Sequence, residues 1–285
     1  MIGPALREVI GGEDFYGFVV ANTLHGFFTL SSSFQSFYVE TLRLTEQRTV
    51  PREAKWYWPV VFTHIGMFKG FRASESLLLK GYPLIGYSLF RDLKDRAFML
   101  AAVARGVISF QDANAFIQPA SGAWSKSDQK KAVKLRKEAD LRIRKNSLGT
   151  TSGFESAKQE RLDRWNQLFH AEVHGSHLTF ASDLDAWLKT GTLRIVNGSP
   201  DLRSLGMHTT HFQEVAWMCI RLLPFLQLTP GEFNANWQEK WNVLNESFKE
   251  ALAALAGPPG EFTQLVIELM DSKFPFTPTS TAYTE

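Results

Sequence analysis

Apolar residues recur every three or four positions along almost every segment of this 285-residue chain. That spacing is close to one turn of an α-helix, so it gathers the apolar side chains on one helix face. The strict alternation that a half-buried β-strand needs is scarce. Only residues 192–202 fit a short strand with a turn at Asn197 and Gly198. The sequence therefore predicts an all-α fold.

The predicted helices have readable ends. A serine or threonine followed three residues later by an acidic residue is typical of a helix start, and this pattern occurs at Ser152, Ser182 and Thr229. Glycines that follow apolar runs predict helix ends at Gly81, Gly106, Gly175 and residues 257–260. The predicted helices span about 14–44, 52–80, 83–105, 110–117, 126–145, 154–174, 183–189, 208–228, 230–255 and 261–273.

Length and composition predict one mostly helical domain over residues 1–272. A chain of this length with 44% hydrophobic residues can bury a large core. Residues 273–285 are rich in proline and threonine, and we expect a flexible tail there. The N-terminal residues lack a signal-peptide pattern, and no uncharged apolar run approaches the ~20 residues of a membrane span. The single cysteine, Cys219, cannot form an intrachain disulfide, so we expect a cytoplasmic protein without a membrane partner.

The aromatic residues are expected to form core. The chain has 23 phenylalanines and 8 tryptophans, which can also stack on nucleic-acid bases. Most of them lie within apolar helices, a position that favours burial. Examples are Phe15, Phe18, Phe27, Phe28, Trp56, Trp58 and Phe62.

One segment breaks the even charge balance of the chain. Residues 124–146 hold nine Lys or Arg against three acidic residues. A helix with this charge can lie along a phosphate backbone, with Lys130, Lys134 and Arg142 among its cations. A solvated surface helix explains the same composition, and the apolar stripe along the segment indicates that it docks on something.

The densest titratable chemistry lies between residues 164 and 177. Three of the seven histidines, His170, His174 and His177, follow Arg164 on a predicted helix that ends at Gly175. Imidazole titrates near neutral pH, so such a cluster can perform acid–base chemistry, bind metal or contact phosphate. On an ideal helix Arg164 lies about 120° from His170 and about 80° from His174, so both histidines are candidates. Capping of a helix C-terminus is the structural alternative.

A metal site is a further alternative for this cluster. His170 and His174 are four residues apart and present two imidazoles on one face, as zinc sites on helices require. His208 and His211, three residues apart on another predicted helix, can complete such a site. Glycine-rich phosphate loops, CxxC pairs and nucleophile elbows are absent, which counts against nucleotide-dependent, redox and serine-hydrolase classes.

A second candidate site lies in residues 68–106, which predict two helices meeting at Gly81, Tyr82 and Pro83. Arg91 and Asp95 are four residues apart on the second of these helices and so share one face. An ordinary surface ion pair is one interpretation. The functional interpretation is a guanidinium held by a carboxylate, ready for an anionic substrate such as a phosphate.

These segments together resemble a known family. A long helix, the GY pair leading into SLFRDLKD, and a later helix that ends in VHGS are similar to the HEPN-like helical superfamily, in particular its bacterial abortive-infection branches. The resemblance covers about residues 55–190, with a basic insertion at 120–153 and additional N- and C-terminal helices. It implies an antiparallel bundle, a homodimer and metal-independent RNA cleavage by an arginine and a nearby histidine. Arg164 and His170, with five residues between them, match that spacing.

The leading hypothesis is an RNA-directed protein of a bacterial defence or toxin-like system, acting as a ribonuclease or as an RNA-binding component. Its catalytic residues would be Arg164, His170 and His174, without a metal or other cofactor. Its partners would be RNA, a second copy and a cognate protein or antitoxin. The substrate-binding residues would be Arg91, Asp95, Lys130, Lys134 and Arg142. The alternatives are a non-catalytic helical interaction module and a metal-dependent hydrolase that uses His170 and His174.

Overall fold

The computed structural model describes residues 3–46, 48–51, 57–104, 188–189, 191, 202–229 and 231–256. These residues are helical and contain no strand, so the predicted all-α class is confirmed for this part of the chain. The helices are α1 (Pro4–Thr23), α2 (His25–Glu46), α3 (Tyr57–Leu79), α4 (Pro83–Ala104), α9 (Leu202–Leu222) and α10 (Ala235–Ala256), with the 3₁₀ helix η2 (Leu223–Leu226). In the described residues, no helix is long and apolar enough to cross a membrane.

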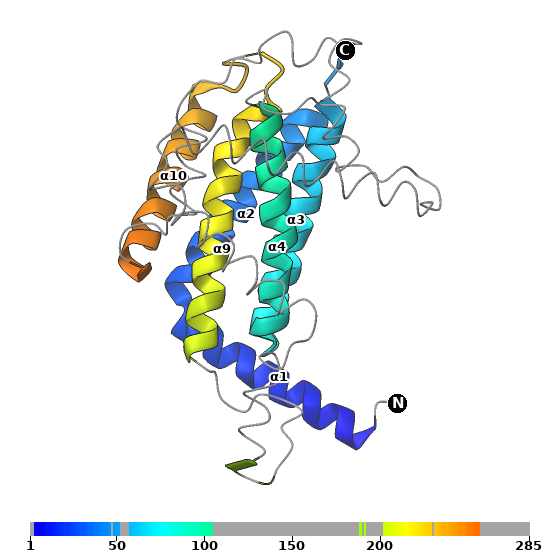
Figure 1. The fold of residues 1–285 in the computed structure, drawn as a ribbon, viewed down its shortest axis with the longest axis vertical. Helices are drawn as coiled ribbons and strands as arrows, with labels where there is room; N and C mark the ends of the chain where they lie inside the picture. The colour runs from blue at the N-terminus through cyan, green and yellow to red at the C-terminus, as the bar shows by residue number, and fades with distance from the viewer. Residues whose placement is uncertain are drawn as a thin grey trace, which may run out of the picture.

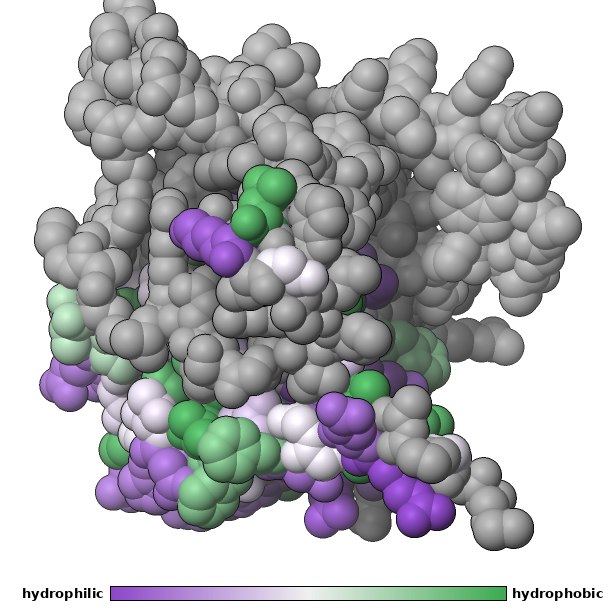
Figure 2. All heavy atoms as spheres, turned by 90° about the horizontal axis from the view of Figure 1, so that it is seen from below, coloured by the Kyte–Doolittle hydropathy of each residue, from purple (hydrophilic) through white to green (hydrophobic). Residues whose placement is uncertain are grey.

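The longer helices form a bundle. In Figure 1, α3 packs along α4, α4 along α9 and α9 along α10, while α2 lies behind them and contacts α3, α9 and α10. Helix α1 lies across one end of the bundle, where it contacts α3 and α2. Seen from that end, apolar and charged side chains lie next to one another on the described surface (Figure 2).

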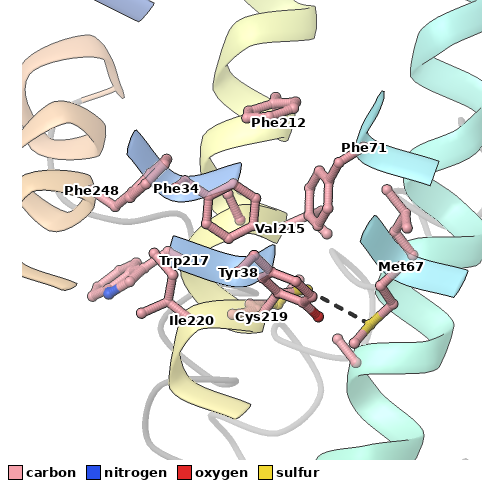
Figure 3. Packing of buried hydrophobic residues seen from close by; sticks show 14 of the residues in the cluster. Phe34, Tyr38, Met67, Phe71, Phe212, Val215, Trp217, Cys219, Ile220 and Phe248 are labelled. Atoms are coloured by element: carbon pink, nitrogen blue, oxygen red, sulfur yellow. Dashed lines mark hydrogen bonds between the residues drawn. The ribbon is translucent and has the colours of Figure 1, made fainter. Parts of the chain in front are cut away.

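A cluster of aromatic rings joins four of these helices. The buried Phe34 ring of α2 lies 5.1 Å from Phe71 of α3, 6.4 Å from Phe212 of α9 and 5.7 Å from Phe248 of α10, all edge to face (Figure 3). Edge-to-face pairs add about 0.5–1.5 kcal/mol each beyond the burial of apolar area. The buried thiol of Cys219 lies in the same core, 3.7 Å from the sulfur of Met67, and the structure confirms that it is a free cysteine.

Indole N–H groups attach α10 to its neighbours. Trp237 donates to the hydroxyl of Thr41 on α2 at 2.9 Å, and Trp241 donates to the carbonyl of Ile220 on α9 at 2.8 Å. A buried indole N–H without an acceptor would destabilise the fold, so each bond selects where α10 docks.

The turn between α3 and α4 confirms the predicted helix end at Gly81. Gly81 has φ +83°, a left-handed conformation that glycine adopts without strain. The N–H of Tyr82 donates to the carbonyl of Leu77 and the N–H of Gly81 to that of Leu78, which together form a Schellman motif. This turn lets α4 begin at Pro83 and return along α3.

The predicted helix over residues 14–44 is two helices in the structure. Helix α1 begins earlier, at Pro4, and ends at Thr23, where Leu24 leaves helical geometry with φ −108° and ψ 32°. The side chains of Asn22 and Thr23 bond to the carbonyls of Phe18 and Val19, and such local bonds compete with the helical backbone pattern.

The predicted start at Thr229, for the helix over residues 230–255, was wrong. Helix α10 begins at Ala235, and the side chain of Asn234 caps it by accepting the N–H of Trp237 at 2.9 Å. The carboxylate of Glu232 instead accepts the N–H of Leu228 and pairs with Arg48 at 3.1 Å. The predicted starts at Ser152 and Ser182 lie outside the described residues.

The prediction that the early aromatic residues form core is confirmed in part. Phe27 is buried and Phe28 is half-buried. Phe15, Phe18, Trp58 and Phe62 are exposed, with 62%, 69%, 38% and 56% of their surface accessible, so the prediction was wrong for these four. Trp56 lies outside the described residues.

Glycine permits the close approach of α4 to α3 and α9. A Cβ atom added at Gly86 would lie 2.6 Å from Cε1 of His208 and 3.1 Å from the carbonyl oxygen of Ser74. Both neighbours are buried, so the site has little room to adjust.

We therefore expect Gly86→Ala to lower the free energy of unfolding by about 1–3 kcal/mol, because the methyl group overpacks the helix contact. Gly206→Ala is the matched control, since no atom lies within 4 Å of its added Cβ. The control should be neutral or stabilising by up to about 1 kcal/mol, as alanine favours the helix. Urea unfolding of both variants measures the difference. Equal stability of the two variants would contradict the close approach at Gly86.

Candidate functional site

Most of the residues predicted to form the site lie outside the described residues. These are Arg164, His170, His174, Lys130, Lys134 and Arg142. Arg91 and Asp95 lie one turn apart on α4, the helix that packs against both α3 and α9, and their side chains are outside the described part. Their proposed pairing stays a prediction.

An ion pair does occur beside them on α4. The Nε of Arg96 lies 2.7 Å from Oδ2 of Asp92, four residues earlier. Both side chains are more than a third exposed, so the pair adds little stability. The same guanidinium lies over Gly66 of α3, where an added Cβ would meet its Nη1 at 3.4 Å.

His208 is a buried structural residue. Its Nδ1 lies 3.1 Å from the carbonyl oxygen of Pro83, to which it donates, and its Nε2 lies 3.2 Å from the hydroxyl of Ser74. The Ser74 hydroxyl is then the donor to Nε2. This chain of bonds resembles the serine–histidine pair of a hydrolase, but both side chains have no accessible surface. Burial lowers the pKa of His208 to about 4, so the ring is neutral and ties α9 to α3 and α4.

His211 and His64 are also held by buried bonds. Nε2 of His211 lies 3.0 Å from the hydroxyl of Tyr87, and Nδ1 lies 3.3 Å from the carboxylate of Glu214. Nδ1 of His64 bonds to the hydroxyl of Tyr38. Burial lowers the pKa of His64 to about 3. All three histidines therefore serve the packing of the bundle.

The contacts of His208 and His211 count against the predicted use of these two residues as metal ligands. Both ring nitrogens of His208 and of His211 already contact protein groups, so a metal ion at either residue would have to displace one of them. Within the described ranges, no three His, Cys, Asp or Glu side chains gather in a way that could hold a metal ion. A metal site at His170 and His174 stays a prediction.

An open groove lies between α2 and α3, and the sequence analysis missed it. Its volume is about 1100 Å³. The apolar residues that line it are Phe28, Val39, Leu44, Phe68 and Leu79. The polar residues that line it are Ser32, Gln35, Ser36, Glu40, Arg43, Arg72 and Glu75.

A buried polar network forms the middle of this groove. Oε1 of Glu75 accepts the hydroxyl of Ser31 at 2.6 Å and the amide of Gln35 at 3.0 Å. Nη1 of Arg72 donates to Oε2 of Glu75 at 2.7 Å and to Oε1 of Gln35 at 3.0 Å. Ser31, Gln35 and Glu75 are buried, while the Arg72 side chain is 56% exposed. The network presents a fixed guanidinium at the groove surface.

A signal for this network exists in the sequence. Ser31 and Gln35 are four residues apart, and Arg72 and Glu75 are three apart, so each pair shares a face of its helix with apolar residues. Polar residues on an apolar face indicate a buried network or a site. The meeting of the two faces, 40 residues apart in sequence, depends on the tertiary packing of α2 on α3.

Comparison with protein-family models, with curated proteins and with solved structures finds no match to this chain.

The two buried neutral histidines predict a pH-dependent stability. His64 and His208 bind a proton near pH 6.5 when unfolded, but only near pH 3 and pH 4 when folded. The unfolded state then binds more protons between these values, so stability is full above about pH 6.5 and falls as the pH is lowered.

We expect His64 and His208 each to lower the free energy of unfolding by about 1.4 kcal/mol as the pH falls from about 7.5 to about 5.5. Urea unfolding at the two pH values measures this change. His208→Gln and His64→Gln should each remove about half of it. A wild-type pH dependence in both buried variants would show that other groups cause it.

Proposed function

We propose that the protein acts on RNA as a HEPN-like, metal-independent endoribonuclease, with Arg164, His170 and His174 as its catalytic residues. The observation that carries the proposal is the placement of the other histidines. Of the seven in the chain, His64, His208 and His211 are buried and bonded within the bundle. Acid–base chemistry near neutral pH then falls to the cluster at residues 170–177, since His25 stands alone at the start of α2 among the described histidines.

The proposed reaction needs a base, an acid and a positive charge. One histidine takes the proton of the ribose 2′-hydroxyl, and the 2′-oxygen attacks the adjacent phosphorus. The bond from phosphorus to the 5′-oxygen breaks, and the second histidine protonates that oxygen. Arg164 stabilises the charge on the pentavalent phosphate. The products are a 2′,3′-cyclic phosphate and a 5′-hydroxyl end, and the step consumes no cofactor.

The basic segment supplies the binding energy in this proposal. Lys130, Lys134 and Arg142 would contact backbone phosphates, and Arg91, held by Asp95, would position a further phosphate. Each neutralised phosphate releases counterions, so affinity should fall steeply with salt. By the family resemblance, the active form is an antiparallel bundle that dimerises, and it works in a bacterial defence or toxin-like system beside a cognate protein.

A second candidate function is that of a helical interaction module. The groove between α2 and α3 favours it, because a groove between two helices that is lined by apolar side chains and two arginines is typical of a surface that binds a protein helix. The two functions are compatible in one chain, since the groove uses none of the proposed catalytic residues.

Cleavage of a mixed RNA pool tests the first proposal. We expect the purified protein to cleave RNA in the presence of a chelator, and Arg164→Ala, His170→Ala and His174→Ala each to lower the rate by about 100-fold or more. His25→Ala is the control and should keep the wild-type rate. Analysis of the cut ends should find the cyclic phosphate.

Two results would overturn this proposal. Cleavage that a chelator abolishes would assign the chemistry to a metal-dependent hydrolase. Wild-type rates in all three variants, or no cleavage by the wild-type protein alone and with added cell extract, would leave the interaction module as the better account.

A further inference from the structure

The walls of the groove follow two helix faces. The lining residues of α3 are Phe68, Arg72, Glu75 and Leu79, at spacings of four, three and four residues. On α2 the lining runs from Phe28 to Leu44 with the same three- and four-residue steps. Residues at these spacings form a continuous stripe along a helix. The groove therefore runs along both helix axes for about 17–24 Å, since an α-helix rises ~1.5 Å per residue.

A groove between two such stripes has the shape that a third helix fills. Side chains of a packing helix fit between the ridges that these spacings create. A helix of about 11–16 residues would span the length of the groove. A compact small molecule would leave most of that length uncovered.

The charges in the groove favour an acidic occupant. Both carboxylates are already compensated: Glu75 by Arg72, and Glu40 by Lys240 of α10, whose Nζ lies 2.8 and 3.0 Å from its two oxygens. Arg43, exposed in the last turn of α2, makes no hydrogen bond or ion pair with the residues that the structure describes. Among those residues its positive charge has no partner, and a carboxylate on a bound helix would complement it.

Arg72 also keeps donors for a ligand. Within the described part of the chain, Nη1 of Arg72 donates to Gln35 and to Glu75, and Nε and Nη2 make no hydrogen bond there, so these two nitrogens remain available on a half-exposed side chain. Those two bonds fix the guanidinium in place, which lowers the entropy that a ligand would cost on binding. Arg72 donates to Gln35 of α2, which lies eight residues before Arg43. The guanidinium groups of Arg72 and Arg43 are therefore about 12 Å apart along the groove.

We propose that the groove between α2 and α3 binds an acidic amphipathic helix of a partner protein. Its carboxylates, seven or eight residues apart, contact Arg43 and Arg72. Its apolar residues pack on Phe28, Phe68 and Leu44. The proposal does not rest on RNA cleavage, because the groove lies on α2 and α3 alone.

A designed peptide tests the proposal on the full-length protein. The probe is a fluorescein-labelled amphipathic helix of about 18 residues, with leucines at helical spacing and two glutamates about seven residues apart on the same face. The matched probe carries lysine at both glutamate positions. Fluorescence anisotropy should find that the acidic probe binds at least about tenfold more tightly than the lysine probe, a difference of about 1.4 kcal/mol.

A charge reversal at Arg43 makes the test specific. Because Arg43 has no partner among the described residues, Arg43→Glu should leave the thermal unfolding unchanged. It should weaken binding of the acidic probe at least about tenfold and strengthen binding of the lysine probe. Lys69→Glu is the matched control, an equal change of charge on the exposed side of α3 outside the groove lining, and should leave both affinities close to wild type.

Other results would overturn the proposal. Equal binding of the two probes, or no binding of either up to about 100 µM, would exclude an acidic helix as occupant. A dimer in sedimentation that Arg43→Glu dissociates would assign the groove to a second copy of this chain. RNA cleavage by Arg43→Glu distinguishes the two proposals, since it should stay at the wild-type rate whether or not the peptide binds.

Discussion

The packing of the Phe34 ring is the contact on which the described bundle depends. It brings α2 against α3, α9 and α10 through Phe71, Phe212 and Phe248. Phe212 also packs edge to face on Phe71 and on Phe27, so the rings support one another. Large rings bury much apolar area and have few rotamers, which makes such a cluster both stabilising and selective. A long stretch of chain separates the pair α2 and α3 from the pair α9 and α10, and this core is what holds the two pairs together.

The same core decides which histidines can do chemistry. Phe90 of α4 lies 5.1 Å from the His208 ring and 6.3 Å from Phe212, so His208 belongs to the aromatic cluster rather than to a cleft. Removal from water disfavours the charged imidazolium, and the bonds to Ser74 and Pro83 satisfy the neutral ring. A residue of this kind contributes specificity of packing, because a misplaced α9 would leave two buried polar atoms without partners. Under the proposed function, proton transfer near neutral pH falls to His170 and His174.

The groove shows a different use of polar side chains. Glu75 is buried yet accepts three hydrogen bonds, so its charge stabilises a network instead of destabilising the core. The network holds Arg72 at the groove surface, and the charge of Arg43 lies about two helical turns away along α2. An acidic neighbour of Arg43 would have neutralised its charge, as Lys240 neutralises the charge of Glu40 at the groove edge. The fold thus keeps cationic groups on an apolar surface, which is an arrangement suited to recognition.

The sequence by itself determined the all-α class of the described residues, the helix end at Gly81 and the free state of Cys219. Helical periodicity and left-handed glycine act over a few neighbouring residues, and a single cysteine has no partner within the chain. It also marked the histidine cluster at 170–177 as a candidate, on composition and spacing alone. Only the tertiary structure decided that Phe27 is buried while Phe15 and Phe18 are exposed, since that depends on the break at Leu24 and on which face of each helix finds a neighbour. It alone decided that His208 meets Ser74 across 134 residues and that Gln35 meets Glu75 across 40. Such contacts depend on how distant helices dock, a property that no local pattern of residues encodes.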